Sequence, residues 1–473
     1  MSAPNGEMKH WWAPVFFSAL AGGMAWGIRG QYGHETGAMM AGLLVSATLV
    51  FLLCPNAPLR FAARALALCT IAMGFGGSMT YGVTLGLSHN PEFVGNWATL
   101  SWGLLGCAIK GGVWIGFAAV FLGMGLGGVR YRPAEMLFVM LAILGAYFIG
   151  VRLFNYPFNP SEGELPFISF SDFNRWDAET EIRPRREQWG GLWLALLTLL
   201  VYAGRHQGDR LAVKLGAWGV VGGVLGFPLG QSIQAFHAWN VDAFQSGLWA
   251  KLDPYMNWWN TMETTFGATM GAVIGLGLWR NRGLIRPTPD DADPSLSFPA
   301  ELLLLAVHLP LLISVEFFSI QQIDALYDLG LILAIIPIVG VLGGRAWPYL
   351  VIFPVILVPI AGKTIRQLGY REEAIALPLG WAIYGALPLL ISLIAAAQFI
   401  RRDQSAPLSA GRAAVLLLLP AWTFFLLNFA FFRYPYPWLD WTGRTPSGIV
   451  FTFCILALTA MAVVGIRRRD EAS

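Results

Sequence analysis

Apolar stretches long enough to cross a membrane recur along the whole chain of 473 residues. A helix needs about 20 mostly apolar residues to cross a bilayer, because hydrocarbon offers no partners for backbone N–H and C=O groups. Hydrophobic residues make up 56% of the sequence and charged residues only 12%, which is not the balance of a soluble domain. We therefore predict an all-α polytopic membrane protein whose main partner is the lipid bilayer.

Reading apolar runs between charged or Pro/Gly-rich breaks gives about fourteen transmembrane helices. The first run follows Lys9, precedes Arg29 and lacks a small-residue cleavage site, so we expect a retained span rather than a signal peptide. The predicted spans are 11–28, 35–54, 62–87, 99–126, 134–153, 189–204, 212–236, 261–279, 299–318, 325–343, 346–362, 375–399, 412–432 and 446–466.

Lysine and arginine orient these spans, because cytoplasmic loops of multi-pass proteins are enriched in both. With the terminal Arg467, Arg468 and Arg469 placed inside, alternate loops carry more positive residues inside than outside. Both termini are therefore predicted to be cytoplasmic. The loop that contains Lys363 and continues to Arg371 is an exception on the outer side. An inner (plasma) membrane location is the expectation for a compact chain without an evident sorting signal.

Glycine divides the chain into two regions, since most of its 54 glycines lie within residues 1–282. Small residues let membrane helices approach closely, so the two regions are expected to pack by different rules. We predict a Gly-rich bundle over 1–282 (spans 1–8) with an outer loop at 154–188. Next we predict a cytoplasmic linker over 283–298, and after it a Leu/Ile/Pro-rich bundle over 299–473 (spans 9–14).

Three helical hairpins in the Gly-rich region share a pattern. The first span ends in residues 29–34 and the seventh in 230–237, and both endings contain Gly-Gln followed by His. Their returning partners, 35–42 and 263–271, both begin with Glu-Thr, and the third span ends at 86–89 with Gly and His. Spans 1–2, 3–4 and 7–8 are therefore predicted to be repeats with parallel topology, unlike the inverted repeats of many carriers.

Polar side chains gather at the predicted outer ends of these hairpins. His34, His89 and His237 each follow the first helix of a hairpin, and they converge if the hairpins pack around one axis. Separate histidines in water-facing loops are the alternative. Their spacing matches no metal-binding motif, so no metal site is predicted, and the sequence specifies no cofactor. His34 and His237 are the candidate general bases of an enzyme.

Arg29, Gln31 and Gln231 lie about one helical turn deeper than the histidines. An arginine fork suits a carboxylate or phosphate, and glutamine offers donors and acceptors to a hydroxyl-rich ligand. A headgroup contact or an ion pair with Glu35 is the plainer role for Arg29.

Lys110 is an ionisable residue within a predicted span, where charges usually face the bundle interior and mark a functional site. It is expected to counter Glu263 or to line a cavity. Tryptophan is unusually frequent, with 20 residues. An interfacial aromatic belt accounts for many of them, whereas sugar stacking is the alternative for loop residues such as Trp258.

A transporter of a small polar solute, such as a sugar or organic acid, is the function that we expect, because no catalytic motif accompanies the polar residues. A membrane-embedded enzyme that acts on a lipid-linked or glycan substrate and a membrane scaffold or accessory subunit are the alternatives. The net charge of +3 is too small and dispersed for a nucleic-acid partner. The candidate ligand-binding residues are Arg29, Gln31, His34, Glu35, His89, Lys110, Gln231, His237, Trp258 and Glu263.

Overall fold

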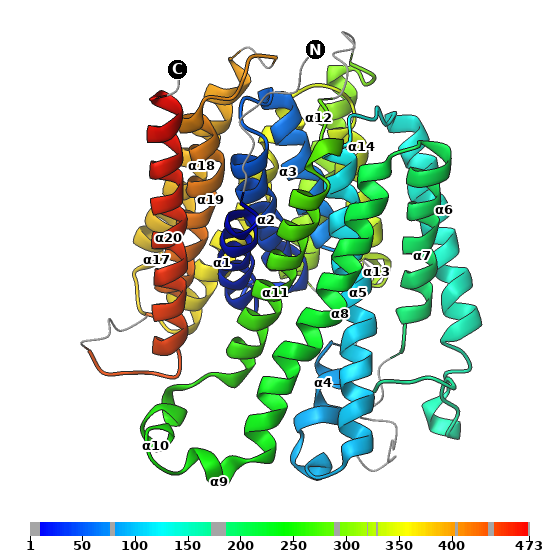
Figure 1. Cartoon of the computed structure of the whole chain (residues 1–473), viewed down its shortest axis with the longest axis vertical. Helices are drawn as coiled ribbons and strands as arrows, with labels where there is room; N and C mark the ends of the chain where they lie inside the picture. Colours follow the sequence, from blue (N-terminus) through cyan, green and yellow to red (C-terminus); the bar gives the residue numbers. More distant parts are fainter. Residues whose placement is uncertain are drawn as a thin grey trace.

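Helices make up all the regular structure of the described residues, which are 10–75, 81–171, 186–287, 294–318, 320–327, 330–402, 405–433 and 439–471. In this computed structural model most long helices run side by side along one direction (Figure 1). Within the described ranges nine helices are long and apolar enough to cross a membrane, or ten if the bent pair Gln321–Tyr327 and Leu331–Val341 is one span. The chain therefore has the architecture of a multi-pass helical membrane protein.

All fourteen predicted spans overlap described helices, although residues 76–80 of the third lie outside the description. Five predicted spans, the first, third, sixth, eighth and tenth, are not among the nine candidates of sufficient length and apolarity, and the tenth corresponds to the bent pair. The total of fourteen, the cytoplasmic position of both termini and the identity of the membrane therefore stay predictions.

Successive contacts join a set of helices into a closed ring. Each member packs on the next, and the last packs on the first. Residues 81–89 form α4, which continues the direction of the chain after α3 and lies between α5 and α8. The ring members are α1 (Trp12–Arg29), α2 (Ala38–Leu53), α3 (Leu59–Met73) with α4 (Tyr81–His89), α5 (Trp97–Leu126), α8 (Arg210–Trp239) and α11 (Trp258–Arg280).

Glycine allows very close backbone contact within this ring. Gly22 of α1 and Gly267 of α11 face each other so closely that neither has room for a Cβ atom. The same holds for Gly111 of α5 and Gly223 of α8. Because α5 and α8 each have 30 residues, they are about 45 Å long and exceed a hydrocarbon core of about 30 Å. The N-terminal end of α5 and the C-terminal end of α8 are joined to short helices at the same end of the molecule (Figure 1).

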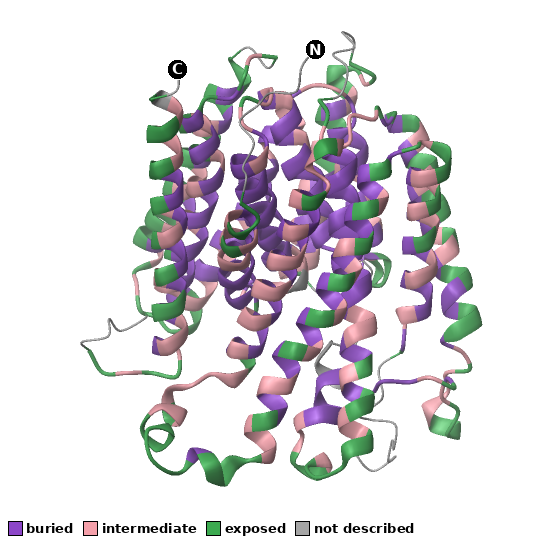
Figure 2. Cartoon of the chain, viewed as in Figure 1, coloured by how far each residue is buried: buried purple, intermediate pink, exposed green. Residues whose placement is uncertain are grey.

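The remaining helices surround the ring. α6 and α7 pair beside α5, and α16, α19 and α20 lie against the first two helices and their connection. Figure 2 shows the central α2 almost entirely buried, whereas outer helices such as α6 and α20 expose one side. The bounds of these helices are α6 (Pro133–Phe154), α7 (Trp189–Val201), α12 (Phe298–Phe317), α13 (Gln321–Tyr327), α14 (Leu331–Val341), α16 (Ile352–Ile365), α18 (Leu387–Ile400), α19 (Ala410–Phe431) and α20 (Thr445–Asp470).

Short helices make the connections and the bends. Four of them in the described residues, η1, η4, η7 and η8, are π-helical turns, which are wider than an α-helix and often occur at functional positions. The short elements are η1 (Gly33–Gly37), η2 (Pro91–Phe93), η3 (Pro160–Glu162), η4 (Tyr202–His206), α9 (Val241–Phe244), α10 (Trp249–Leu252), η5 (Asp253–Tyr255), η6 (Arg282–Leu284), α15 (Trp347–Leu350), η7 (Arg366–Arg371), α17 (Leu377–Gly380) and η8 (Trp381–Ala386).

Candidate functional site

The candidate site begins where α1 ends. α1 closes at Arg29, and the chain turns through Gly30 and Gly33 into the π-helical turn η1. Gly33 has a φ of +90°, a conformation that side chains with a Cβ rarely adopt. A Cβ on Gly30 would lie 2.9 Å from Oε2 of Glu263. Glycine at these two positions therefore lets charged groups of other helices approach the turn.

Arg29 and Glu263 form an ion pair across the contact between α1 and α11. The guanidinium Nη2 lies 2.8 Å from Oε1 of Glu263, and the two side chains are only 1% and 2% exposed. The Trp259 and Asn260 side chains also hydrogen-bond the Glu263 carboxylate. A buried ion pair is stable only when such additional bonds replace the lost water. The surroundings of Glu263 meet this requirement.

Aromatic rings fill the interior of the helix ring one turn before Arg29. The ring centroids of Trp26 and Trp114 are 4.8 Å apart, and Phe266 lies 4.7 Å from Trp26. Phe227 stacks on Phe266 at 4.8 Å, so α1, α5, α8 and α11 each contribute one ring. Cζ of Arg29 lies 4.9 Å from the Trp26 centroid. The Arg29 guanidinium therefore rests on an aromatic floor formed by these four rings.

A second charged group adjoins the first and involves the later part of the chain. A Cβ on Gly33 would lie 2.8 Å from Nζ of Lys363, 3.5 Å from Oε2 of Glu316 and 3.7 Å from Oε2 of Glu35. Lys363 is ion-paired with Glu316 and donates a 2.8 Å hydrogen bond to the Tyr32 carbonyl. These three ionisable side chains come from α16, α12 and η1, so the first and last parts of the chain meet here.

Lys363 corrects the expectation that it belongs to an outer loop. It lies within α16, its side chain is 8% exposed, and η7 continues the helical path to Arg371. Glu316 lies in the predicted Leu/Ile/Pro-rich bundle, from which the sequence offered no candidate site residue. Sequence reasoning missed both because their pairing joins residues 47 positions apart. One sequence feature pointed to Lys363: it lies in a predicted loop that carries positive charge on the outer side, where few lysines and arginines are expected.

Gln231 and His89 meet where α4 packs against α8. Nε2 of Gln231 lies 3.2 Å from Nδ1 of His89 and donates a 2.6 Å hydrogen bond to Oγ of Ser88. The His89 ring also faces Trp259 at 6.2 Å between centroids. Since Trp259 hydrogen-bonds Glu263, His89 and Gln231 are linked to the Arg29–Glu263 pair through one tryptophan.

His237 and Trp258 belong to a separate cluster at the far end of α8. The two rings stack at 4.4 Å, and Nε2 of His237 lies 2.9 Å from Oδ1 of Asp253. The Trp258 indole donates a 2.7 Å hydrogen bond to the same oxygen. His89 and His237 thus have different partners, while the His34 side chain lies outside the described residues. Among the residues described, no group of three or more His, Cys, Asp or Glu is placed to hold a metal ion.

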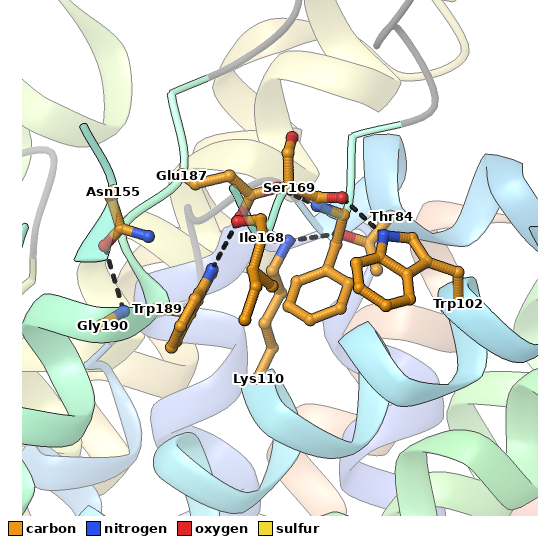
Figure 3. A network of polar contacts seen from close by, with 10 residues as sticks. Thr84, Trp102, Lys110, Asn155, Ile168, Ser169, Glu187, Trp189 and Gly190 are labelled. Carbon is orange, nitrogen blue, oxygen red and sulfur yellow. Dashed lines mark hydrogen bonds and ion pairs between the residues drawn. The ribbon is translucent and has the colours of Figure 1, made fainter. Parts of the chain in front are cut away.

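Lys110 contacts Glu187, which belongs to the predicted outer loop, rather than Glu263 (Figure 3). Nζ of Lys110 lies 3.4 Å from Oε2 of Glu187 and hydrogen-bonds Thr84 of α4. Glu187 is buried and accepts a 2.7 Å hydrogen bond from the Phe170 N–H. The expectation that Lys110 counters Glu263 is therefore wrong, because each has another partner. Of the predicted outer loop, residues 172–185 lie outside the description.

Several buried polar atoms on the ring helices have no hydrogen-bond partner among the described residues. They include Nε1 of Trp26, Oε1 of Gln231 and Oδ1 of Asn260. Their residues are 0%, 0% and 3% exposed. Buried polar atoms are nearly always hydrogen-bonded, so unpaired ones indicate a place for water or a polar ligand. Gln31 lies half-buried in the turn after Arg29.

No known protein family matches this sequence, and no curated protein or solved structure matches it either. The function must therefore be argued from the arrangement of the side chains.

Proposed function

We propose that the chain is a transporter of a small polar solute, with Arg29 at the centre of its binding site. The observation that carries the proposal is the buried Arg29–Glu263 pair inside a ring of apolar helices. Charged side chains within a membrane bundle are costly and usually mark a solute or ion pathway. The wide turn η1, directly after Arg29, supplies the interrupted helix that many carriers use at the binding site.

The chemistry around Arg29 fits an organic acid or a sugar acid. The guanidinium can accept a carboxylate in a two-bonded fork, in exchange for its contact with Glu263. The unpaired oxygens of Gln231 and Asn260 can accept hydrogen bonds from solute hydroxyls, and the Trp26 N–H can donate one. The aromatic floor below Arg29 would bar the solute from the opposite side in this conformation.

Parallel hairpins are part of the proposal. The ring contains three pairs that follow one another around it, α1–α2, α3/α4–α5 and α8–α11, and this order supports the proposed repeat. The close glycine contacts between α1 and α11 and between α5 and α8 leave few side chains to obstruct sliding of one helix on another. We infer that glycine-rich packing serves movement of the hairpins during transport.

Accessibility from both sides of the membrane tests this proposal. The four cysteines are all free and buried, so a Cys-free background is the starting point. Gln31→Cys lies on one side of the aromatic floor and Ser18→Cys on the other, and exposed Ser246→Cys is the positive control. A thermal-shift panel of malate, citrate, gluconate and glucose first identifies a stabilising solute.

In a transporter, that solute should change labelling of the two cysteines by a membrane-impermeant thiol reagent in opposite directions. Uptake of the radiolabelled solute into liposomes should be lost in Arg29→Gln and kept in the exposed control Arg433→Gln. Absence of solute entry by the unaltered protein, with Ser18→Cys unlabelled in every condition, would rule transport out.

A membrane-embedded enzyme is the second candidate, favoured by the His237–Asp253 contact of 2.9 Å. A carboxylate beside an imidazole can orient it as a general base. For the enzyme, conversion of a glycan or lipid-linked substrate should be lost in His237→Gln and should not require Arg29.

A further inference from the structure

Glu35, Glu316 and Lys363 form a compact charged cluster that the proposed solute site does not by itself require. The Lys363 and Glu316 side chains are 8% and 3% exposed, and Glu35 is half-buried at the turn after Arg29. All three charged ends surround Gly33, the glycine with positive φ in η1. The cluster thus lies at the bend that connects the two helices of the first hairpin.

The charges of this cluster do not balance. Glu35 and Glu316 share one ammonium group, while the neighbouring Arg29, whose charge also acts on Glu35, is paired with Glu263. Arg444 acts on Glu263, and the Arg366 guanidinium lies 5.5 Å from the Phe317 ring centroid. α2 contributes no titratable residue, and the side chain of His34 in η1 is outside the description. With both carboxyls ionised, the cluster therefore carries one excess negative charge among apolar helices.

The hydrogen bonds show which carboxyl is free to change its protonation. Oε1 of Glu316 accepts a 2.5 Å hydrogen bond from the Thr36 hydroxyl, and Oε2 is bonded to Lys363. Both oxygens of Glu316 are thus held as acceptors, as in a carboxylate. The Glu35 carboxyl accepts its hydrogen bond from its own backbone N–H. Protonation of Glu316 would weaken bonds to two other side chains, whereas protonation of Glu35 would not.

A metal cation fits this place less well than a proton. Sodium and other hard cations need several oxygen ligands around one point. Here the Lys363 ammonium already occupies the position between Glu316 and the Tyr32 carbonyl. A proton needs only one carboxylate oxygen, and it removes the excess charge completely.

We propose that Glu35 binds and releases one proton and that this proton drives the transporter. The inference rests on the proposed function and names its coupling ion. Protonation turns the Glu35 carboxylate into a neutral carboxylic acid, so Lys363 pairs with Glu316 alone. Release of the proton restores the charge and makes two carboxylates compete for Lys363. Because Glu35 lies in the turn next to Arg29, this change acts on the solute site directly.

Infrared spectroscopy of the full-length protein in lipid tests proton binding without any solute. A carboxylic acid C=O band should disappear as the pH is raised, and Glu35→Gln should lack that band while exposed Glu92→Gln keeps it. Lys363→Gln should move the midpoint to higher pH, because its cation no longer favours the carboxylate. Absence of a titrating band in the unaltered protein overturns the proposal even if the variants do not fold. So does a midpoint that shifts when NaCl replaces choline chloride.

Liposomes that contain a pH-sensitive dye separate this inference from the proposed function. With the solute from the thermal-shift panel outside, the interior should acidify with the unaltered protein and not with Glu35→Gln. Solute uptake without acidification overturns proton coupling and leaves transport standing. A titrating Glu35 band without solute uptake overturns transport and leaves the proton site standing.

Discussion

Arg29 and Glu263 are 234 residues apart in the sequence, yet their side chains form a 2.8 Å ion pair in the protein interior. Removing one member of a buried pair leaves the other charge unpaired, which costs about 3–5 kcal/mol. Arg29→Gln and Glu263→Gln should therefore each lower the thermal unfolding temperature strongly, and the double variant should recover part of the loss. The exposed pair Arg433–Glu372 is the control and should contribute at most about 1 kcal/mol. Additive effects of the two buried substitutions would contradict a direct interaction.

Gly33→Ala should disrupt the turn after α1 for two reasons. Alanine at a φ of +90° costs about 1–2 kcal/mol, and its Cβ would also contact the Lys363 ammonium. Gly95 has a nearly identical φ of +88°, but a Cβ there meets nothing within 4 Å. Comparison of Gly33→Ala with Gly95→Ala in thermal unfolding thus isolates the effect of the charged cluster. Equal losses in the two variants would mean that Lys363 moves away freely.

Lys110 should hold the loop segment that contains Glu187 against α4 and α5 (Figure 3). Lys110→Met removes the cation opposite Glu187, whose buried carboxylate accepts the Phe170 N–H. We expect hydrogen exchange at Phe170 to become about tenfold faster, which corresponds to about 1.4 kcal/mol of opening free energy. Exchange in α20, which does not contact this loop, serves as the internal reference. Unchanged exchange at Phe170 would show that the loop is held by its tryptophan contacts alone.

Asp209 should make stability depend on pH. It precedes α8, where its carboxylate accepts hydrogen bonds from Tyr131 and from the Ala212 N–H, and burial raises its pKa above the ordinary value of 3.8. A raised pKa in the folded state means that folding favours the protonated acid. This stabilisation is complete below the unfolded-state pKa and is lost as the pH rises through the folded-state pKa.

The unfolding temperature of the unaltered protein should consequently rise relative to that of Asp209→Asn as the pH falls from neutral toward 3.8. Tyr131→Phe removes a donor to the carboxylate and should move this growth to higher pH. A difference between the unaltered protein and the Asp209→Asn variant that is the same at every pH would refute the buried-carboxyl interpretation.

Helix positions could be predicted well because hydrocarbon imposes a simple requirement on length and polarity. The predicted span 134–153 corresponds to Pro133–Phe154, and 99–126 to Trp97–Leu126. The number of spans was harder, because helices lined by glycine and threonine, such as Trp258–Arg280, are not strongly apolar. Burial against other helices, rather than contact with lipid, decides where they lie, and a single sequence does not report it.

The candidate site could be predicted only in part. Arg29, Glu263, Gln231 and His89 do lie in one connected group, whereas His237 and Lys110 have other partners. Hairpin resemblance indicated which ends of the helices carry polar residues. The resemblance among the predicted hairpins could not indicate which residues pair. Lys363, the partner of Glu316, and Glu187, the partner of Lys110, come from segments outside those hairpins.

The long sequence separations within the site also have a consequence for synthesis. Arg29 enters the membrane well before Glu263, and at about 5–20 residues per second the delay is roughly 12–47 seconds. The hydrogen bond between the Tyr32 carbonyl and Lys363 can form only later still, because Lys363 is synthesised 331 residues after Tyr32. During biogenesis the first helix must therefore hold its arginine near water or against a membrane insertase. A nascent chain that is released early would carry an unpaired charge, which quality-control proteases can recognise.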